Sequence, residues 1–415
     1  MGSTLFVTGH SSMAEHPHAG ALEGGSPRVA LLFADALAAI ETAWSLRAAG
    51  AHVLAIASAG RKVPLRHSRK VQVVEVTAPE RDRVRCQSEI QETVRKYGID
   101  HLLLLDDVSI ALVEELELPC NVVGPTGTQA RLALDKSRQI AAARAAGFAV
   151  PPTVVIDDPR DVGELATPLV LKPVDAARLD DGRAVRGPTF LCADPNELKE
   201  GLRGIPAGHR YLAQELIVGR GRGVFGLHTE RGIEHWSGHL RIRMMNPAGS
   251  GSSACEPAGV SEEIAAATKQ LLHDAGWHGL FMVELLETPD GKIWFIELNG
   301  RPWGSMALSR AVGLEYPAWA VAAAEDPAAQ FSPRRPKRPP RLARHLGREI
   351  VHLAFVFRGP RTRTPILWPK RRKALLEVLR VQRGTRWYNW HPGEFAVFVA
   401  DTWRTVSEQA RRWRR

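Results

Sequence analysis

Three polar residues alternate in the stretch FIELNGRPWGS (295–305), where an apolar strand runs into a polar turn. Glu297 and Asn299 lie two positions apart, Arg301 follows at the same interval, and alternate side chains of a strand point to the same face. Carboxylate and carboxamide oxygens are hard ligands suited to Mg²⁺. A guanidinium just past the strand can fork onto a phosphate.

A second carboxylate is expected to face the first. The strand GLFMVELLET is followed closely by KIWFIELN, and either a two-residue turn at Asp290-Gly291 or a four-residue loop gives the same register. In that register Glu284 lies opposite Glu297, and facing carboxylates destabilise a sheet. The sequence therefore predicts a cation held by these two residues and Asn299. The alternative is a solvent-facing amphipathic hairpin, which the apolar flanking residues disfavour.

Four basic residues upstream stand where they can meet phosphate groups. Lys136 lies near the start of a helix, and Lys172 interrupts the apolar strand PLVLKPV. Arg241 and Arg243 alternate in HLRIR, which predicts two guanidinium groups on one face. Such a lysine can also be an edge or snorkelling residue, and the arginines can also cover an exposed face. Paired arginines and paired carboxylates on one sheet nevertheless favour a polyphosphate site.

The elements that must position these residues fall into two groups. In the first, apolar runs alternate with helical periodicity, which predicts a small parallel sheet with helical crossovers, an α/β layer domain. Its strands are expected at 28–34, 51–57, 71–76 and 101–105, with helices at 37–50 and near 87–97. No GxGxxG motif follows the first strand, so a dinucleotide site is not indicated.

The second group is α+β. A helix at 134–147 precedes the strand that carries Lys172, and TFLCADPNEL (189–198) is a strand that runs into a helix start. There Asp194 is the expected N-cap, with Glu197 completing a capping box. Strands of one antiparallel sheet are expected at 211–217, 223–229, 234–245, 280–288 and 292–299, with a helix near 261–275.

Positive charge is concentrated in the C-terminal segment. The 415 residues carry a net charge of +10, but residues 331–415 hold 22 Lys and Arg against 5 Asp and Glu, while the rest holds 33 against 40. Helices are expected there at 342–357 and 370–381, and five tryptophans are interleaved with the arginines. The segment can pack on the acidic body, contact an anionic membrane surface or bind nucleic acid, although no nucleic-acid motif is present.

Composition argues against several classes of protein. The chain is 44% hydrophobic and 24% charged, with no secretory leader and no apolar run of about 20 residues, so a cytoplasmic location is expected. Its four cysteines lack the spacing of a zinc knuckle or a disulfide framework. Residues 1–27 are rich in Gly, His, Ser and Pro and are expected to be a disordered leader.

Taken together, these residues resemble the ATP-grasp superfamily of carboxylate-amine and carboxylate-thiol ligases, nearest to its carbamoyl-phosphate-synthase-like branch. Six stretches carry the resemblance in order: LDKSRQIAAARAAGFAVPPTVV, PLVLKPV, YLAQELIVGRG, HLRIR…GSGSS, GLFMVELLE and FIELNGRPWGSMALSRAVGLEYP. The last is the most specific, because family members end a strand with Glu-x-Asn-x-Arg.

The resemblance implies a fold that combines α/β and α+β parts. The implied divisions are a Rossmann-like pre-ATP-grasp domain at 28–127, an ATP-grasp domain at 128–330 and a basic extension at 331–415. Within the second, the small lobe is expected at about 150–216 and the large lobe at about 217–330. ATP, with Mg²⁺ or Mn²⁺, is expected to bind between the lobes.

The resemblance also implies roles for residues. Members activate a carboxylate by transfer of the γ-phosphoryl group, then let an amine or thiol displace phosphate, and such transfer depends mainly on positioning and charge neutralisation. Lys136 and Lys172 match the lysines that contact the phosphates of ATP. Gln214, Glu215, Leu216 and Ile217 match the hinge between the two lobes, which holds adenine. Those that match metal ligands are Glu284, Glu297 and Asn299. Arg301 matches the arginine on the transferred phosphate, and Arg241, with Arg243 as a further candidate, matches residues that stabilise an acyl-phosphate.

Two departures from the family pattern leave an alternative open. Gly221 stands near the position where a carboxylate commonly holds the ribose, and the loop at 174–188, usually rich in glycine, has only Gly182 and Gly187. The alternative is a weak or inactive nucleotide-binding module tethered by its tail to a membrane or an anionic polymer. The expected partners are small-molecule acids, amines or thiols; a homodimer stays open, and nucleic acid is not expected.

Overall fold

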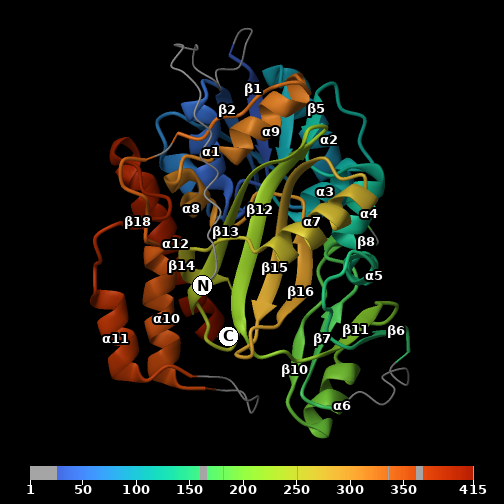
Figure 1. Cartoon of the computed structure of the whole chain (residues 1–415). Coiled ribbons are helices and arrows are strands. Elements are labelled where there is room, and N and C mark those ends of the chain that lie inside the picture. Colours follow the sequence, from blue (N-terminus) through green and yellow to red (C-terminus); the bar gives the residue numbers. More distant parts are fainter. Residues whose placement is uncertain are drawn as a thin grey trace.

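The computed structural model describes residues 26–158, 166–180, 182–249, 251–334, 336–360 and 368–414. The expected leader at 1–27 lies almost wholly outside these residues. The first strands form a parallel five-stranded sheet in the order β3-β2-β1-β4-β5 (Figure 1). Its elements are β1 (Arg28–Leu32), α1 (Ala39–Ala48), β2 (His52–Ser58), η1 (Pro64–His67), β3 (Gln72–Val76), α2 (Arg83–Tyr97), β4 (His101–Leu104), α3 (Asp107–Val113) and β5 (Asn121–Val123).

Strand β1 is apolar after Arg28 because both faces of this sheet are covered. Val29 and Leu31 pack in one core with α1, whereas Ala30 and Leu32 pack in another with α2 and α3. Parallel sheets with helical crossovers bury both faces in this way. The expected α/β layer domain is confirmed.

The next part is a small antiparallel sheet with the order β10-β7-β11-β6. The elements of this part of the chain are α4 (Gly127–Leu134), α5 (Lys136–Ala145), β6 (Thr153–Ile156), β7 (Leu169–Pro173), β8 (Arg178–Asp180), β9 (Arg183–Val185), β10 (Phe190–Cys192), α6 (Pro195–Arg203) and β11 (Tyr211–Glu215). Strands β8 and β9 form a two-stranded sheet of their own. Asp194 caps α6 as expected, but Glu197 accepts from the amide of Ala193 instead of completing a capping box. The expectation that 211–217 joins the later strands is wrong, because β11 pairs with β6 and β7.

A seven-stranded sheet in the order β16-β15-β12-β13-β14-β17-β18 forms the centre of the molecule (Figure 1). Its elements up to residue 325 are β12 (Arg220–Thr229), β13 (Gly232–Met244), β14 (Ser252–Pro257), α7 (Glu262–Asp274), β15 (Gly279–Glu287), β16 (Ile293–Asn299), α8 (Met306–Ala311) and α9 (Tyr316–Glu325). Val224 and Phe281 on one face pack against α5 and α7. Phe225 and Met282 on the other share a core with α1, α9 and the parallel sheet. The large sheet and the N-terminal domain therefore share one continuous core.

The hairpin between β15 and β16 reaches the expected pairing by another route. Glu284 pairs with Glu297 as predicted. Both turn lengths considered are wrong, however, because Glu287 pairs with Ile293, and Gly291 adopts a left-handed φ of 84° in the turn between them. A register shift beside Glu284 then restores the predicted pairing.

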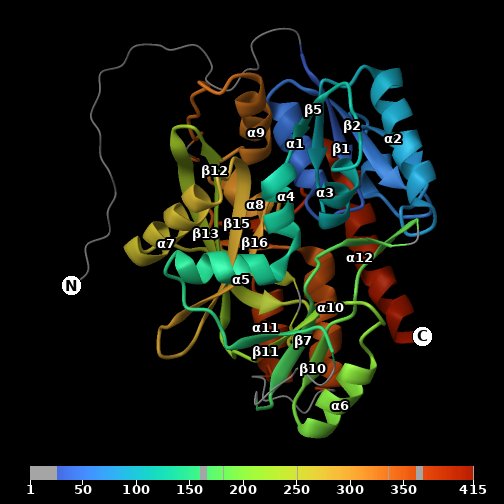
Figure 2. The ribbon, with the colours of Figure 1, turned by 90° about the vertical axis from the view of Figure 1, so that its right-hand side faces the viewer.

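Residues from 342 onward are part of the main fold. β17 (Leu342–Arg344) and β18 (Thr385–Trp387) extend the seven-stranded sheet, so the expected helix at 342–357 begins later, as α10 (Leu346–Arg358). The next helix is α11 (Arg371–Leu379), and the short η3 (Pro392–Glu394) leads into α12 (Phe395–Arg414). Helix α12 packs against α10 and against η1 of the N-terminal domain (Figure 2). In the described part of the chain, no helix is long and apolar enough to span a membrane.

Candidate functional site

Two ion pairs mark the place where the carboxylates of the large sheet meet basic residues. Lys136 Nζ lies 3.3 Å from Glu297 Oε1, and Arg241 Nη2 lies 2.8 Å from Glu284 Oε2. Lys136 is the first residue of α5, a helix that Asp135 caps through the amide of Ser137. The expected repulsion between the facing carboxylates is thus balanced by one protein cation on each.

Arg241 reaches Glu284 by crossing the intervening strand β12 at a glycine. Arg241 is on β13 and Glu284 on β15, and β12 lies between these strands. A Cβ at Gly221 would lie 2.5 Å from Arg241 Cδ. The first departure from the family pattern therefore has a structural reason, because any side chain at position 221 would occupy the path of Arg241.

Lys172 enters the same charge cluster from β7 of the small sheet, where it pairs with Leu212 of β11. Burial lowers its pKa to about 8; the carboxylates of Glu297 and Glu284 oppose this effect, and the ammonium of Lys136 adds to it. The structure therefore brings together two lysines, two carboxylates and one arginine that the sequence places far apart.

Arg301 binds a carboxylate that the sequence did not single out. Its Nε lies 2.8 Å from Asp107 Oδ1 and its Nη2 3.3 Å from Oδ2, so the guanidinium forks onto the first residue of α3. Burial alone would lower the pKa of Arg301, but the carboxylate of Asp107 outweighs this effect, so the pKa is raised. Burial alone would raise the pKa of Asp107, but the guanidinium of Arg301 outweighs this effect, so the pKa is lowered. Asp107 follows the buried strand β4. Ligand-binding sites of parallel α/β sheets lie outside the carboxyl ends of the strands, where polar residues such as this one are found. The motif LLLLDD could have identified it.

The end of β16 is fixed from two sides. Gln139 of α5 donates to the carbonyl of Leu298 at 3.0 Å and accepts from its amide at 2.9 Å, which orients the strand between Glu297 and Asn299. Asn299 itself is 5% exposed. A Cβ at Gly300 would lie 2.2 Å from Pro125, so only glycine fits before Arg301.

The aromatic residue of the same motif is part of the core. Trp303 is 1% exposed and stacks on Phe225 of β12, with ring centroids 4.7 Å apart. A Cβ at Gly304 would lie 2.5 Å from Leu37. The motif therefore joins the large sheet to the N-terminal domain as well as presenting polar groups.

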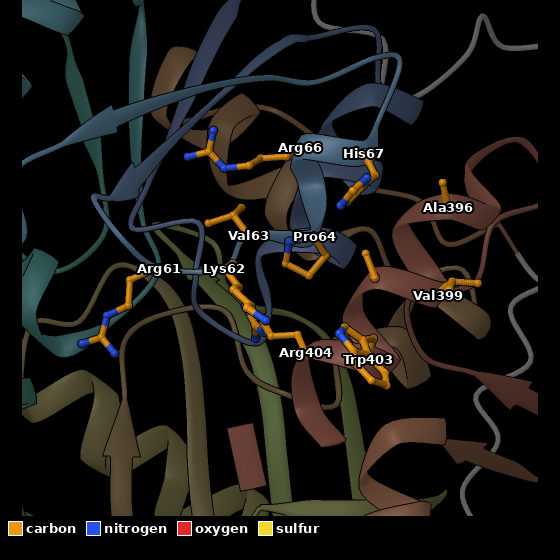
Figure 3. A pocket seen from close by; sticks show the side chains of 11 residues that line it. Arg61, Lys62, Val63, Pro64, Arg66, His67, Ala396, Val399, Trp403 and Arg404 are labelled. Atoms are coloured by element: carbon orange, nitrogen blue, oxygen red, sulfur yellow. The ribbon is translucent and has the colours of Figure 1, made fainter. Parts of the chain in front are cut away.

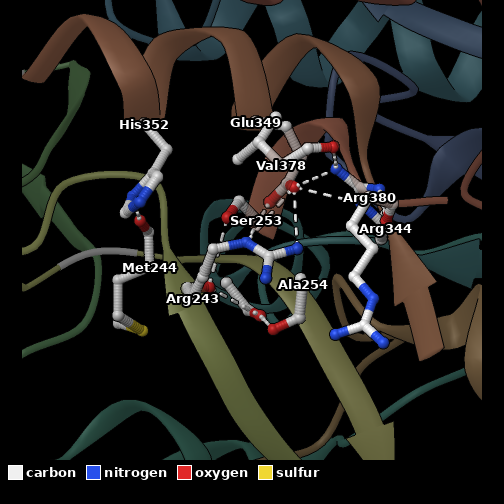
Figure 4. A network of polar contacts seen from close by, with 10 residues as sticks. Arg243, Met244, Ser253, Ala254, Arg344, Glu349, His352, Val378 and Arg380 are labelled. Atoms are coloured by element: carbon white, nitrogen blue, oxygen red, sulfur yellow. Dashed lines mark hydrogen bonds and ion pairs between the residues drawn. The ribbon is translucent and has the colours of Figure 1, made fainter. Parts of the chain in front are cut away.

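Arg243 does not join Arg241. The pairing of β13 with β14 shifts between these two residues, so their strict alternation is interrupted. Arg243 Nη2 instead lies 2.8 Å from Glu349 of α10, and Arg344 Nη2 lies 2.6 Å from the same carboxylate oxygen (Figure 4). Glu349 is 0% exposed. The structure thus places Arg243 in a buried ionic cluster beneath α10.

A further arginine near Arg241 was not predicted. Arg348 of α10 donates to the carbonyl of Ser252 at 3.0 Å, and a Cβ at Gly251 would lie 2.4 Å from its Nη1. Within the described residues it forms no ion pair. Burial lowers its pKa to about 10; Tyr388 and Asp401 oppose this effect, and the charges of Arg404 and Arg241 add to it. Arg348 therefore adds a second guanidinium to the neighbourhood of Arg241.

The four residues expected around adenine lie at the end of β11. Gln214 is buried and donates to Thr153 Oγ1 at 2.8 Å, so its side chain braces two strands. Glu215 is exposed, and Leu216 and Ile217 are half-buried. The structure thus leaves Glu215 and the two apolar residues accessible at this edge.

The loop at 174–188 forms the hairpin β8–β9, which docks on the N-terminal domain. The carbonyl of Gly182 accepts from the amide of Arg83 at 2.7 Å, and the amide of Ala184 donates to Pro79 at 2.9 Å. Ala177 and Ala184 are buried in the core formed with α2 and α3. Arg186 continues the contact with Asp106 at 2.6 Å. A packed hairpin explains why this loop carries so few glycines.

The donor set for a metal is small. Among the described residues no group of three His, Cys, Asp or Glu side chains is arranged to hold an ion. Glu284 and Glu297 face each other in register, and Asn299 follows on the second strand. Two carboxylates and one carboxamide fit Mg²⁺, which retains waters and takes phosphate oxygens as further ligands.

Known structures share this architecture. The L-amino acid ligase from Bacillus licheniformis matches with a TM-score of 0.60 and 18% identity, over 77% of this chain and 79% of that chain. The N5-carboxyaminoimidazole synthetase from Staphylococcus aureus matches with 0.56 and 14%, over 75% and 80%. Biotin carboxylase from Campylobacter jejuni matches with 0.54 and 14%, over 74% and 72%.

These proteins are ATP-grasp enzymes, and the chain has the ATP-grasp fold, as its motifs indicated. The Staphylococcus aureus synthetase has also been solved with ADP, and a biotin carboxylase domain from Hydrogenobacter thermophilus with MgADP and bicarbonate. No known family model and no curated protein matches the sequence.

Proposed function

We propose that this protein is an ATP-dependent ligase that joins a carboxylate to an amine or thiol through an acyl-phosphate, releasing ADP and phosphate. The observation that carries the proposal is the convergence of Lys136, Lys172 and Arg241 on Glu284 and Glu297. Cations from three elements around two carboxylates suit a reaction that depends on neutralising phosphate charge. The likeness in fold to an L-amino acid ligase supports the same reaction class.

Glu284, Glu297 and Asn299 would hold Mg²⁺, and a bound ion there would supply charge neutralisation for the phosphates of ATP. In the structure Lys136 and Arg241 neutralise these carboxylates. A competing cation would release both basic side chains to bind phosphate oxygens. Lys172, with a pKa of about 8, is mostly protonated at pH 7 and can do the same.

Arg301 and the hinge complete the proposed nucleotide site. Asp107 fixes the guanidinium of Arg301 from one side, and we place its remaining donors on the transferred phosphate. Glu215, Leu216 and Ile217 would contact adenine, whereas Gln214 supports the strand through Thr153. ATP would then lie between the small and large sheets.

We propose that the substrate acid binds beside Arg241 and Arg348. Arg241 is paired with Glu284, whereas Arg348 forms no ion pair with a described residue. A partly buried guanidinium that forms no ion pair is unfavourable, so an anionic substrate group would stabilise it. Arg243, bound to Glu349, supports the sheet instead of contacting the acyl-phosphate.

The alternative, an inactive nucleotide-binding module, rested on Gly221 and the loop at 174–188. Both departures follow from local packing against Arg241 and the N-terminal domain. Neither removes a proposed metal ligand or a phosphate-binding lysine. The ligase is therefore the function that the site supports best.

The test is turnover of ATP with a panel of carboxylates, amines and thiols. Bicarbonate belongs in the panel, because a structural neighbour contains it. The wild-type protein should release ADP and phosphate with at least one pair of substrates, and Glu297→Gln should lose roughly a hundredfold or more. The matched control, Glu262→Gln on the exposed start of α7, should retain activity. ATP binding without turnover on any pair would refute the ligase.

A further inference from the structure

A groove of about 660 Å³ lies between the N-terminal domain and the last helix, and it shares no residue with the candidate site. Figure 3 shows side chains of the η1 segment on one side and of α12 on the other. Its apolar lining consists of Val63, Pro64, Ala396, Val399, Ala400 and Trp403. The two segments are more than 300 residues apart in sequence, so only the fold reveals this surface.

The apolar lining continues into an exposed stripe along α12. Phe395, Val399 and Trp403 follow one another at intervals of four residues, and they are 55%, 48% and 66% exposed. Trp390, 47% exposed, packs edge-on against Phe395 with ring centroids 5.7 Å apart. Residues four apart share one face of a helix, and contiguous exposed apolar side chains mark interaction surfaces.

The rim of the groove is basic. It is formed by Arg61, Lys62, Arg66, His67 and Arg404. Arg61 and Arg66 are partly neutralised by Glu80 and Glu75. Among the described residues Lys62 and His67 form no ion pair, and neither do the neighbouring exposed residues Arg69 and Lys70. The partner must therefore tolerate a surplus of positive charge.

Arg404 holds the two sides of the groove together. Its Nη1 donates to the carbonyl of Asp35 at 3.1 Å and to that of Lys62 at 3.2 Å. Ser68 adds a hydrogen bond of 3.1 Å to the buried Glu394, just before α12. The basic segment and the aromatic stripe are thus fixed side by side and form one surface.

We propose that this surface docks on an anionic lipid bilayer. Trp403, Val399 and Phe395 would enter the interfacial region while Lys62 and its basic neighbours contact lipid phosphates and carboxylates. Tryptophan at the interface, with basic residues beside it, is the composition that such surfaces favour. A symmetric second copy fits less well, because it would bring two basic rims together. Nucleic acid is less favoured because the sequence carries no nucleic-acid-binding motif. This inference is independent of the proposed ligase activity.

The test is co-sedimentation of the full chain with vesicles of phosphatidylcholine, alone or with about a third phosphatidylserine. Binding should require the anionic lipid and weaken at high salt. The double variant Val399→Ser, Trp403→Ser should weaken it roughly tenfold or more, and Lys62→Glu should weaken it in a salt-dependent way.

The matched control is Leu376→Ser, Leu379→Ser on α11, whose side chains are equally exposed at 69% and 67%. It should bind as the wild type does, and unfolding curves should show that every variant is folded. Equal binding to neutral vesicles, or unchanged binding by the folded Val399→Ser, Trp403→Ser variant, would overturn the proposal. So would a dimer in solution that this variant dissociates, or RNA bound in preference to vesicles.

Discussion

Each carboxylate of the candidate site has a basic partner of its own. Glu297 is paired with Lys136 and Glu284 with Arg241. A facing pair of glutamates was predicted to need a cation, and the protein's own side chains supply two of them. Removing a carboxylate therefore leaves a basic group unpaired, which is why glutamine, an isosteric acceptor, is a better test than alanine.

Replacing Lys172 by an apolar residue should stabilise the protein at neutral pH. Its pKa is about 8 in the folded protein and 10.5 ordinarily. Below pH 8 the buried ammonium therefore lowers the free energy of unfolding. Between pH 8 and 10.5 the free energy of unfolding rises with pH, because the folded chain has released the proton while the unfolded chain still holds it. Lys172→Met should raise Tm at pH 7 by roughly 2–4 °C, with no difference above about pH 10.5, and should weaken ATP binding. Thermal unfolding from pH 7 to 11 measures this. A lower Tm at pH 7 would mean that attraction to Glu297 outweighs burial.

Gly221 should not tolerate the carboxylate that the family pattern would place there. The Cβ of an aspartate would lie 2.5 Å from Arg241 Cδ, and its carboxylate would draw the guanidinium away from Glu284. Gly221→Asp should therefore lower kcat/KM for ATP roughly tenfold or more. The control is Gly259→Ala, where an added Cβ meets nothing within 4 Å. A lower KM for ATP with kcat unchanged would instead support ribose binding at position 221.

At the scale of elements, α10 is anchored to the sheet by charge. Glu349 is fully buried between Arg243 and Arg344. Removing one member of a buried ionic cluster leaves the others uncompensated, so Glu349→Ala should lower the free energy of unfolding by about 3–5 kcal/mol. Urea denaturation measures the loss, and Glu230→Ala, at an exposed turn, should change it little. A change below about 1 kcal/mol would show that solvent reaches the cluster.

The sequence pattern of strands predicted where the strands lie, but it did not predict the bulges within them. The parallel sheet and the pairing of Glu284 with Glu297 followed from alternation and apolar runs. Arg243 was misplaced because alternation assumes a regular strand, and a register shift after Arg241 breaks it. The correct carboxylate pairing depended on two errors that cancel, a turn of the wrong length and an unforeseen bulge. Bulges leave little trace in the sequence, whereas buried strands and N-caps leave recognisable patterns of residues.

At the scale of the whole molecule, contacts between distant segments were beyond the reach of the sequence. Asp107 with Arg301, and η1 with α12, join residues about 200 and more than 300 positions apart. The basic stretch at 61–70 does not stand out in the charge balance of residues 1–330, because acidic residues outnumber basic ones over that longer segment. The basic composition of the C-terminal segment predicts an extension, yet β17 and β18 complete the large sheet.

The C-terminal segment should be required for cooperative folding. Deleting 331–415 would remove β17 and β18, uncover the edge of β14, and take away Asn389, whose amide donates to the buried Glu41 at 2.6 Å. It would also expose the core residues that pack with Val397. The truncated chain should therefore lose cooperative unfolding, and an exposed sheet edge favours aggregation.

Circular dichroism during heating, with light scattering, measures this outcome. The full chain with Trp403→Ala is the control, because that side chain is 66% exposed and should leave the transition unchanged. A soluble truncated chain with a sharp transition would show that the N-terminal domain and the large sheet fold without these strands. That outcome would also make the segment a separable extension. If the truncated chain instead fails to fold, the surface at α12 can be tested only by point variants.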